Sequence, residues 1–174
     1  MEIAPVAIPV DSLAAAYPFN DYADAFVAHL RTEDCLSPDD LLIRLWTSMP
    51  GWVLALLKLR AVLVKPFGLK SGEVDSALLE EGIRQGKPVG LFSFPGKKDD
   101  ETLCLLSDKH LDALLSAVVR PTKTGGCDAY LCTKVKFHNR LGRLYFCVIR
   151  PFHCLVVRSM LRRACSSQFH KKLG

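Results

Sequence analysis

Apolar and polar positions follow two different spacings in the first part of the chain. Residues 21–30 (DYADAFVAHL) alternate with a period of two and contain no turn residue, which predicts a β-strand. One side of that strand carries Tyr22, Asp24, Phe26, Ala28 and Leu30. The apolar spacing then becomes helical, starting where Ser37 can cap a helix and Pro38 suits its first turn. A strand followed by a helix is therefore expected.

Two further helices are expected before residue 87. Residues 52–64 (WVLALLKLRAVLV) are apolar nearly all round and are interrupted only by Lys58 and Arg60. Because so short a run with two charges cannot span a bilayer, we expect a helix buried under a sheet. Residues 74–86 (VDSALLEEGIRQG) are amphipathic and end at Gly86, which is typical of a short helix with a glycine cap.

From Lys87 onward the pattern is that of an antiparallel sheet. A short strand is predicted at 89–94, and 101–106 with 110–120 would form a hairpin whose loop is Asp108 and Lys109. That loop would pair Leu106 with Leu111. A last strand is predicted at 128–138. Alternation gives this sheet one apolar face and one wet face, and it assigns Lys134, Lys136 and His138 to the wet face.

The final element is a long helix from about Asn139, which can cap it, to about Cys165. At helical spacing, one side of it gathers Arg140, Arg143, Arg150, Arg158 and Arg162. The opposite side carries Tyr145, Ile149, Phe152, Val156 and Met160. We expect this apolar side to pack on the apolar face of the sheet.

Length and charge limit the organisation of the chain. We expect residues 1–174 to form a single domain, with 1–17 and 166–174 as flexible ends. Residues 1–128 hold all 18 Asp and Glu with 13 Lys and Arg, whereas 129–174 hold ten Lys and Arg and no acid. Such asymmetry is typical of proteins that bind nucleic acid or an anionic membrane. The alternative is that the basic end neutralises the acidic front within one fold.

The seven cysteines show no spacing typical of zinc or redox sites, and their number is odd. The first residues, MEIAPVAIPVD, do not resemble a signal peptide. We therefore expect a cytoplasmic protein with free cysteines in its core and no structural disulfide. Asp108, His110 and Asp112 look like a ligand cluster, but the pattern assigns them to a turn and to the wet face. No bound metal is expected.

Three stretches carry a resemblance to a known family: DYADAF (21–26), DKHLD (108–112) and HNRLGRLYFCVIRPFHCLVVRSMLRR (138–163). With its order of elements, the chain resembles an uncharacterised bacterial domain family in the START-like (SRPBCC) superfamily. The resemblance implies an α+β helix-grip fold, in which a curved antiparallel sheet wraps around a long C-terminal helix, with two or three helices after the first strand. Members of the superfamily commonly bind apolar molecules between sheet and helix, and some, such as polyketide cyclases, act on them. Where the family tends to place a large aromatic residue after HLD, this chain has Ala113, which would either widen the cavity or be compensated by a neighbouring side chain.

The candidate cavity wall combines the apolar faces of two strands and the last helix: Leu115, Leu131, Thr133, Val135, Phe137, Tyr145, Ile149 and Phe152. Thr133 and Tyr145 would either orient a ligand or bond only to backbone. No nucleophile elbow, phosphate loop or GxGxxG arrangement is present, so no catalytic residue and no cofactor is assigned.

The leading hypothesis is binding of an apolar or amphipathic small molecule. One alternative is a cavity enzyme of cyclase or hydratase type. The other is a peripheral protein that binds anionic membrane or nucleic acid through its basic C-terminal helix.

Overall fold

The computed structural model describes residues 1–64 and 75–166, and for 60–64 it describes the backbone alone. The elements follow one another along the chain in this order: β1 (Ile3–Val6), α1 (Leu13–Ala16), β2 (Tyr22–Leu30), the 3-10 turn η1 (Thr32–Asp34), α2 (Pro38–Thr47), α3 (Gly51–Val64), α4 (Ser76–Gln85), β3 (Phe92–Ser93), β4 (Lys97–Lys98), β5 (Glu101–Ser107), β6 (Leu111–Pro121), β7 (Cys127–Phe137) and α5 (Arg140–Ala164).

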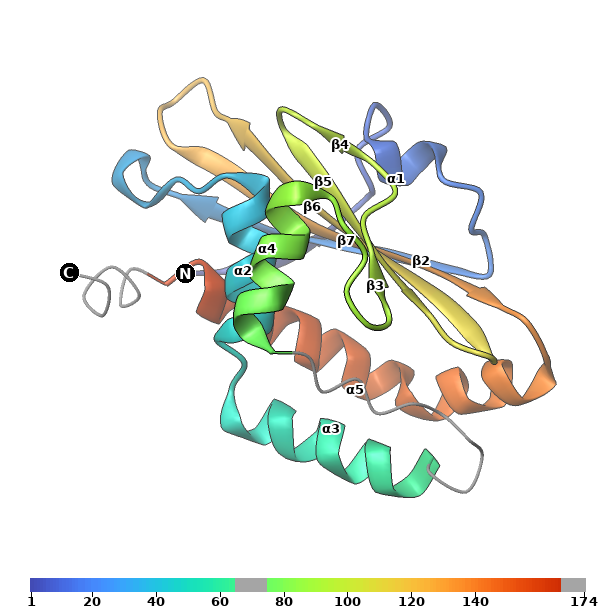
Figure 1. Ribbon diagram of the computed structural model, residues 1–174. Helices are drawn as coiled ribbons and strands as arrows, with labels where there is room; N and C mark the ends of the chain where they lie inside the picture. The colour runs from blue at the N-terminus through green and yellow to red at the C-terminus, as the bar shows by residue number, and fades with distance from the viewer. Residues whose placement is uncertain (65–74, 167–174) are drawn as a thin grey trace.

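One antiparallel sheet organises the fold (Figure 1). Its strand order is β1-β2-β7-β6-β5-β3, and the short β4 pairs with β5. The long α5 follows the last strand and crosses the face of the sheet on which α2 also packs. An open antiparallel sheet followed by a long C-terminal helix confirms the predicted α+β, helix-grip-like fold class.

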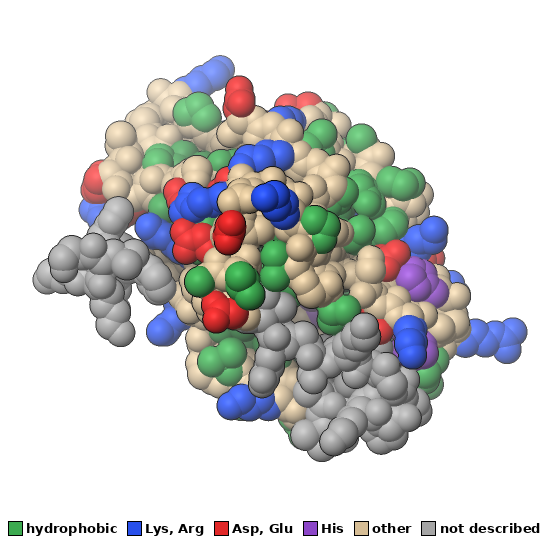
Figure 2. Space-filling model, viewed as in Figure 1, with side chains coloured by type: hydrophobic (Ala, Val, Ile, Leu, Met, Phe, Trp, Pro, Cys, Tyr) green, Lys and Arg blue, Asp and Glu red, His purple; other side chains and the backbone are tan. Residues whose placement is uncertain are grey.

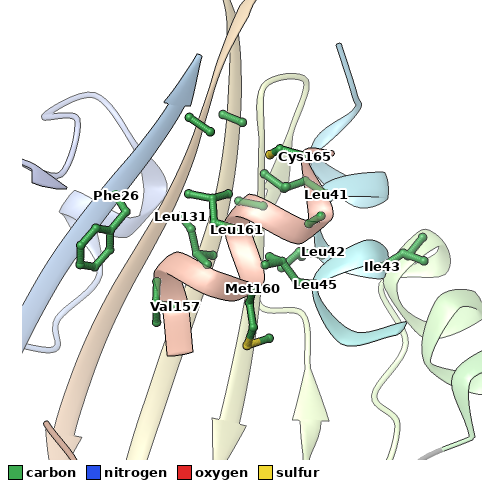
Figure 3. Packing of buried hydrophobic residues seen from close by; sticks show 14 of the residues in the cluster. Phe26, Leu41, Leu42, Ile43, Leu45, Leu131, Val157, Met160, Leu161 and Cys165 are labelled. Carbon is green, nitrogen blue, oxygen red and sulfur yellow. The ribbon is translucent and has the colours of Figure 1, made fainter. Parts of the chain in front are cut away.

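The main core lies between the sheet and the helices α2 and α5. Ser37 caps α2 through a bond from the Asp40 backbone N–H, as the sequence predicts. Leu41, Leu42 and Leu45 of α2 meet Val157 and Leu161 of α5 and the sheet residues Phe26 and Leu131 (Figure 3). Burying a leucine or phenylalanine side chain contributes about 1.5–3 kcal/mol, so these contacts are what hold α2 and the C-terminal half of α5 on the sheet.

The second face of the sheet is also covered, by the N-terminal segment. Leu103, Leu114, Val118 and Cys132 pack against Ala14 and Phe19 in a second core. Glu101 is 0% exposed on this face and accepts hydrogen bonds from Leu13 N, Ala14 N and the Ser116 hydroxyl. At the other end of α1, the Lys134 ammonium donates to the carbonyls of Ala15 and Tyr17.

The hydrogen bonds of Glu101 and Lys134 to the two ends of α1, which we call the clamp, bear on two expectations. The N-terminal segment covers the face that carries Lys134, so Lys134 is buried, whereas Lys136 at the end of the same strand and His138 just after it are exposed as predicted. Residues 1–17, which the sequence predicts to be a flexible end, contain β1, which pairs with β2, and α1, which forms hydrogen bonds at both ends. A short helix with a carboxylate at its N-terminus and an ammonium at its C-terminus has both ends of its dipole compensated. Of the other expected flexible end, residues 167–174 lie outside the described part of the chain.

The corner that leads into α5 is tied to the β5–β6 hairpin. Leu106 pairs with Ala113, not with Leu111, so the loop is two residues longer than predicted. Within the longer loop, the His110 carbonyl accepts a hydrogen bond from His138 N. Next to the loop, the Asp112 carboxylate lies 2.9 Å from His138 Nε2. Because the shift is by two, every side chain keeps its predicted face. His110 and Asp112 are therefore partly buried at this corner, rather than on an open wet face.

Gly142 in the first turn of α5 allows a close approach to the same loop. A Cβ atom at this position would meet the His110 carbonyl oxygen at 2.1 Å. Asn139 caps the helix through the Gly142 backbone N–H, again as the sequence predicts. Any side chain at position 142 would push the start of α5 away from the hairpin.

Two of the seven cysteines form a disulfide, which corrects the expectation that all are free. Cys127 begins β7, and the loop after β2 brings Cys35 to it, with the two Cα atoms 5.9 Å apart. The remaining five are free. Three of these, Cys104, Cys132 and Cys165, are small core residues as predicted, and burial raises the pKa of each to about 12.

α3 is a helix as predicted, but it is not buried under the sheet. The chain turns by 70° at the break between α2 and α3, which carries α3 away from the sheet. Val53 alone among its residues 51–59 is fully buried, whereas Trp52, Leu54, Leu57 and Leu59 are exposed. An apolar sequence was sufficient to predict the helix, but the direction of the turn decided its environment.

Replacing the buried carboxylate of Glu101 tests the clamp on α1. Glu101→Gln turns an acceptor oxygen into an NH₂ group that faces backbone donors, so we expect a loss of about 2–4 kcal/mol in unfolding free energy. The control Glu80→Gln removes a surface ion pair with Arg84 and should cost less than about 1 kcal/mol. Urea denaturation followed by circular dichroism measures both. Equal stability of the two variants would contradict the clamp.

Thiol titration tests the disulfide. Denatured, unreduced protein should react at five thiols, and all seven should react after reduction. Removing the crosslink with Cys35→Ser and Cys127→Ser should lower the unfolding free energy by about 2–4 kcal/mol. Cys147→Ser, at an exposed free cysteine, is the control and should leave stability unchanged. Seven reactive thiols without reduction would contradict the pairing.

Candidate functional site

A cluster of four polar side chains lies where α5 crosses β2 and β7. Tyr22 and Asp24 belong to β2, Thr133 is the β7 residue paired with Asp24, and His153 comes from the middle of α5. The Tyr22 hydroxyl donates to Asp24 Oδ2 at 2.7 Å, and His153 Nε2 lies 3.1 Å from the same oxygen. A single carboxylate oxygen therefore links the sheet to the helix. We call these four residues the polar cluster.

The other oxygen of Asp24 has no such partner. Asp24 Oδ1 and Thr133 Oγ1 are both buried, and neither forms a hydrogen bond of normal geometry within the described part of the chain, although the Thr133 hydroxyl lies near enough to Asp24 to help lower the pKa of its carboxyl. Thr133 is 2% exposed, and the side chains of Asp24 and His153 are 15% and 16% exposed. An unpartnered buried polar atom costs about 1–3 kcal/mol. Two of them on directly paired residues indicate a position for a further hydrogen-bonding atom.

The surroundings of the polar cluster shift the pKa values of Asp24 and Tyr22 in opposite directions. Burial opposes ionisation of Asp24, but hydrogen bonds from His153 and Tyr22 outweigh it and lower the pKa of the carboxyl. Burial, and then the Asp24 carboxylate, raise the pKa of Tyr22. At neutral pH Asp24 is therefore a carboxylate and Tyr22 a neutral hydrogen-bond donor. Shifts of this kind in pKa values are found at functional sites and also in structural ion pairs.

Aromatic rings form a wall beside the polar cluster. The Tyr22 ring is 4.7 Å from Phe146 and 5.7 Å from His153, and Phe137 is 5.4 Å from Phe146, measured between ring centroids. The Arg150 guanidinium lies over the Tyr22 ring at 5.5 Å. An apolar, aromatic wall with a few converging polar groups is the usual composition of a small-molecule site.

The residues predicted to line a cavity are divided among three environments. Leu131, Thr133 and Val135 are buried on the helix-side face of β7. Leu115, Phe137, Tyr145 and Ile149 are partly buried. Phe152 is 52% exposed. Thr133 belongs to the polar cluster, and Phe137 belongs to its aromatic wall.

The expected contact of Phe152 with the sheet is wrong, because α5 is rotated about its axis relative to the prediction. The side chains that pack inward are Phe146, Val157, Met160, Leu161 and Ala164. α5 carries apolar residues on more than one side, so periodicity alone did not determine which side meets the sheet. Contacts with α2 and β7 select the inward side.

Two open grooves lie on the surface of the described residues. One encloses about 620 Å³ at the junction of β7 and α5 and is lined by Phe137, His138, Asn139, Arg140, Arg143, Leu144 and Cys147. Histidine and basic side chains gather at this end of the molecule, where α5 begins (Figure 2). The other encloses about 510 Å³ and is lined by Ser37, Pro38, Asp39, Lys97, Lys98, Asp99 and Thr102. Phe137 belongs both to the first groove and to the aromatic wall.

Sequence reasoning missed Tyr22, Asp24 and His153 as site residues. A signal for Asp24 existed, because it shares the strand face of Phe26, Ala28 and Leu30, where a charge is out of place. No signal for His153 existed, because its role depends on the rotation of α5. Among residues 1–64 and 75–166, no group of three or more His, Cys, Asp or Glu side chains is placed to hold a metal ion.

Apolar side chains are exposed mainly on two helices. Among the side chains that the structure describes, nine of the thirteen large exposed apolar ones belong to α3 or α5: Trp52, Leu54, Leu57, Leu59, Leu141, Leu144, Val148, Phe152 and Leu155. By length and composition α5 is also able to cross a membrane, as is the bent pair of α2 and α3 if it forms one span. The core helix of a soluble protein passes the same test, and α5 supplies core residues here.

The open sheet, the long helix across it and the polar cluster between them define a small α+β sheet-and-helix protein. A family model described as a protein of unknown function (DUF2867) matches residues 17–160, a range that contains the whole polar cluster. The chain therefore belongs to the DUF2867 family. Comparison with curated proteins and with solved structures gave no match.

The lowered pKa of Asp24 predicts a specific dependence of stability on pH. A carboxyl whose pKa is lower in the folded state stabilises the fold fully above its unfolded pKa and loses this as pH falls through the folded value. We expect Asp24→Asn to cost about 1–3 kcal/mol of unfolding free energy at pH 7, with a difference from wild type that shrinks below about pH 4.

Denaturant titrations between pH 7 and pH 2 provide the measurement. Asp128→Asn is the matched control, because Asp128 also lies beside a histidine, at 2.6 Å from His29 Nδ1, but that histidine is 71% exposed. The control should cost less than about 1 kcal/mol. A cost for Asp24→Asn that did not change with pH would contradict the assignment.

Proposed function

We propose that the protein binds an amphipathic small molecule between the sheet and α5, and that its fold is of the START-like type. The observation that carries the proposal is the pair of buried oxygens, Asp24 Oδ1 and Thr133 Oγ1, which lie beside an aromatic wall and lack a hydrogen bond of normal geometry. The open sheet with α5 across one face supports the START-like assignment, in which a ligand lies between these two elements.

The chemistry of the two oxygens defines the polar part of the ligand. Asp24 is a carboxylate and accepts only, whereas the Thr133 hydroxyl both donates and accepts. A ligand hydroxyl would satisfy both, by donating to Asp24 Oδ1 and accepting from Thr133 Oγ1. A single ligand N–H would satisfy only one of the two oxygens, and an amino group that donated to both would leave the Thr133 proton without an acceptor. We therefore propose a hydroxyl group on an apolar or aromatic body.

The apolar part of the ligand would contact the aromatic wall. Phe146 is placed between Tyr22 and Phe137, with ring centroids 4.7 Å and 5.4 Å away. Phe137 also lines the 620 Å³ groove at the start of α5, whose volume lies in the range of about 300–1,000 Å³ usual for ligand sites. Arg140 and Arg143 at the groove would favour a ligand that also carries an acidic group.

One observation favours an enzyme as the second candidate. Asp24 and His153 form a carboxylate–imidazole pair, an arrangement that orients a histidine for proton transfer. Asp24 occupies the Nε2 side of the ring, so Nδ1 would be the atom that exchanges a proton with a ligand hydroxyl. We favour binding without turnover, because it requires only contacts with the two buried oxygens and the aromatic wall.

Native mass spectrometry of the purified protein tests for a ligand that co-purifies. A bound adduct should disappear on denaturation, and its occupancy should fall at least tenfold in Thr133→Val. Asp128→Asn should retain it, because this residue lies at the other end of the β2–β7 pairing. If no adduct is detected, the proposal depends on the binding of matched probes with and without a hydroxyl.

A matched pair of probes tests the hydroxyl requirement. 2-Naphthol and naphthalene share one apolar body and differ in a hydroxyl, which should be worth about 1–3 kcal/mol where it meets buried partners. By fluorescence titration, wild-type protein should prefer 2-naphthol about tenfold or more. Thr133→Val should abolish this preference and leave naphthalene binding unchanged. No adduct in the spectrometer and no preference for 2-naphthol would together overturn the proposal.

A further inference from the structure

An apolar stripe runs along the outer side of α5. Leu141, Leu144, Val148, Phe152 and Leu155 follow one another at intervals of three or four residues and are 38% to 64% exposed. At helical spacing this stripe lies opposite the inward side, which carries Phe146, Val157 and Leu161. α5 is therefore apolar on two opposite sides, of which the fold buries one. Exposed apolar surfaces of this extent usually mark a binding surface.

α3 adds a second apolar surface in the same part of the molecule. Figure 1 shows α3 beyond α5, on the side remote from the sheet. Trp52, Leu54, Leu57 and Leu59 are 40% to 54% exposed. Tryptophan is enriched where proteins meet the boundary between lipid and water. We call the apolar stripe of α5 and the exposed apolar residues of α3 together the docking surface.

The charges beside the docking surface have one sign. Neither 51–64 nor 140–164 contains an Asp or Glu. Arg140, Arg158 and Arg162 lie along one edge of the α5 stripe at helical spacing, and all three are exposed. Of the arginines in α5, Arg143 alone has a carboxylate nearby within the described part of the chain, Asp21 at 4.0 Å. The acidic front of the chain therefore does not neutralise this helix.

We infer that the docking surface binds an anionic lipid bilayer, with α3 and α5 lying in the plane of the membrane. The apolar stripe enters the boundary between headgroups and acyl chains, and the arginines beside it contact lipid phosphates. A nucleic acid would use the arginines but would leave the apolar stripe in water. A second copy of the chain would bring uncompensated arginines against one another.

α5 lies on the membrane rather than across it. Val157, Leu161 and Ala164 are 4%, 0% and 0% exposed and belong to the main core. If α5 crossed the bilayer, these side chains would leave α2 and the sheet, and the core would open. The outer stripe is available without any such change.

Co-sedimentation with vesicles tests the inference. Vesicles of phosphatidylcholine alone are compared with vesicles containing 30% phosphatidylglycerol, at low and physiological salt. Wild-type protein should bind the anionic vesicles at both salts, more weakly at physiological salt because of screening. Binding to neutral vesicles should be at least tenfold weaker.

Two pairs of variants separate the apolar and basic contributions. Leu144→Gln with Val148→Gln, and Arg140→Glu with Arg162→Glu, should each reduce partitioning onto anionic vesicles at least tenfold. The first control, Leu78→Gln, changes an exposed leucine on α4. The second, Lys87→Glu with Lys123→Glu, alters the net charge as much as the arginine pair does, at exposed sites elsewhere. Both controls should bind within twofold of wild type, and circular dichroism should show every variant folded.

Tryptophan fluorescence gives a second readout, which can be measured on the wild-type protein. Emission of wild-type protein should shift to shorter wavelength on anionic vesicles, and Trp52→Phe should remove most of that shift while the protein still sediments. This distinguishes Trp52 on the docking surface from the partly buried Trp46.

Four results would overturn the inference. The first is equal binding to neutral and anionic vesicles, or no binding to either. The second is a wild-type dimer in solution that dissociates on Leu144→Gln with Val148→Gln, which would make a second copy the occupant. The third is binding to DNA or RNA that is lost with the arginine pair alone. The fourth is resistance to alkaline carbonate extraction, which would show that α5 spans the membrane.

Discussion

α5 can turn only one side toward the sheet, and this constraint decides the environment of every apolar side chain on the helix. The C-terminal half of α5 is fixed by Val157 and Leu161, which pack among the leucines of α2 and against Leu131 (Figure 3). Once that side is fixed, His153 faces the sheet and Phe152 faces outward. The polar cluster and the docking surface are thus two consequences of one rotation about the helix axis.

The sheet contributes to this arrangement by being covered on both faces. On the far side, Glu101 and Lys134 hold the ends of α1, and the N-terminal segment closes a second core. A sheet that is rigid on its far side provides a fixed base for Asp24 and Thr133 on its near side. Hydrogen-bond geometry at a ligand depends on such rigidity, because a displacement of about 1 Å is enough to lose much of a polar contact.

Apolar surface is distributed unevenly in this protein. The main core is dense around α2 and the second half of α5, whereas α3 and the outer side of α5 keep large side chains in water. Each exposed leucine forgoes stabilisation of about 1.5–3 kcal/mol that burial would provide. Such a loss is compatible with folding because the core is complete without these residues, and it makes association of the docking surface favourable.

The sequence by itself determined the local elements and the fold class. The alternation in β2, the Ser37 and Asn139 caps, the Gly86 stop and the extent of α5 depend on neighbouring residues only, so pattern and propensity were sufficient to predict them. Tertiary structure decided the rest. The β5–β6 register depends on where His138 bonds, the environment of α3 on the 70° turn after α2, and the Cys35–Cys127 pairing on the loop after β2. The polar cluster required the rotation of α5, which is fixed by packing against residues more than a hundred positions away in the sequence. Hydrophobic periodicity identifies which residues share a side of an element, but which side is buried depends on the surfaces that meet it.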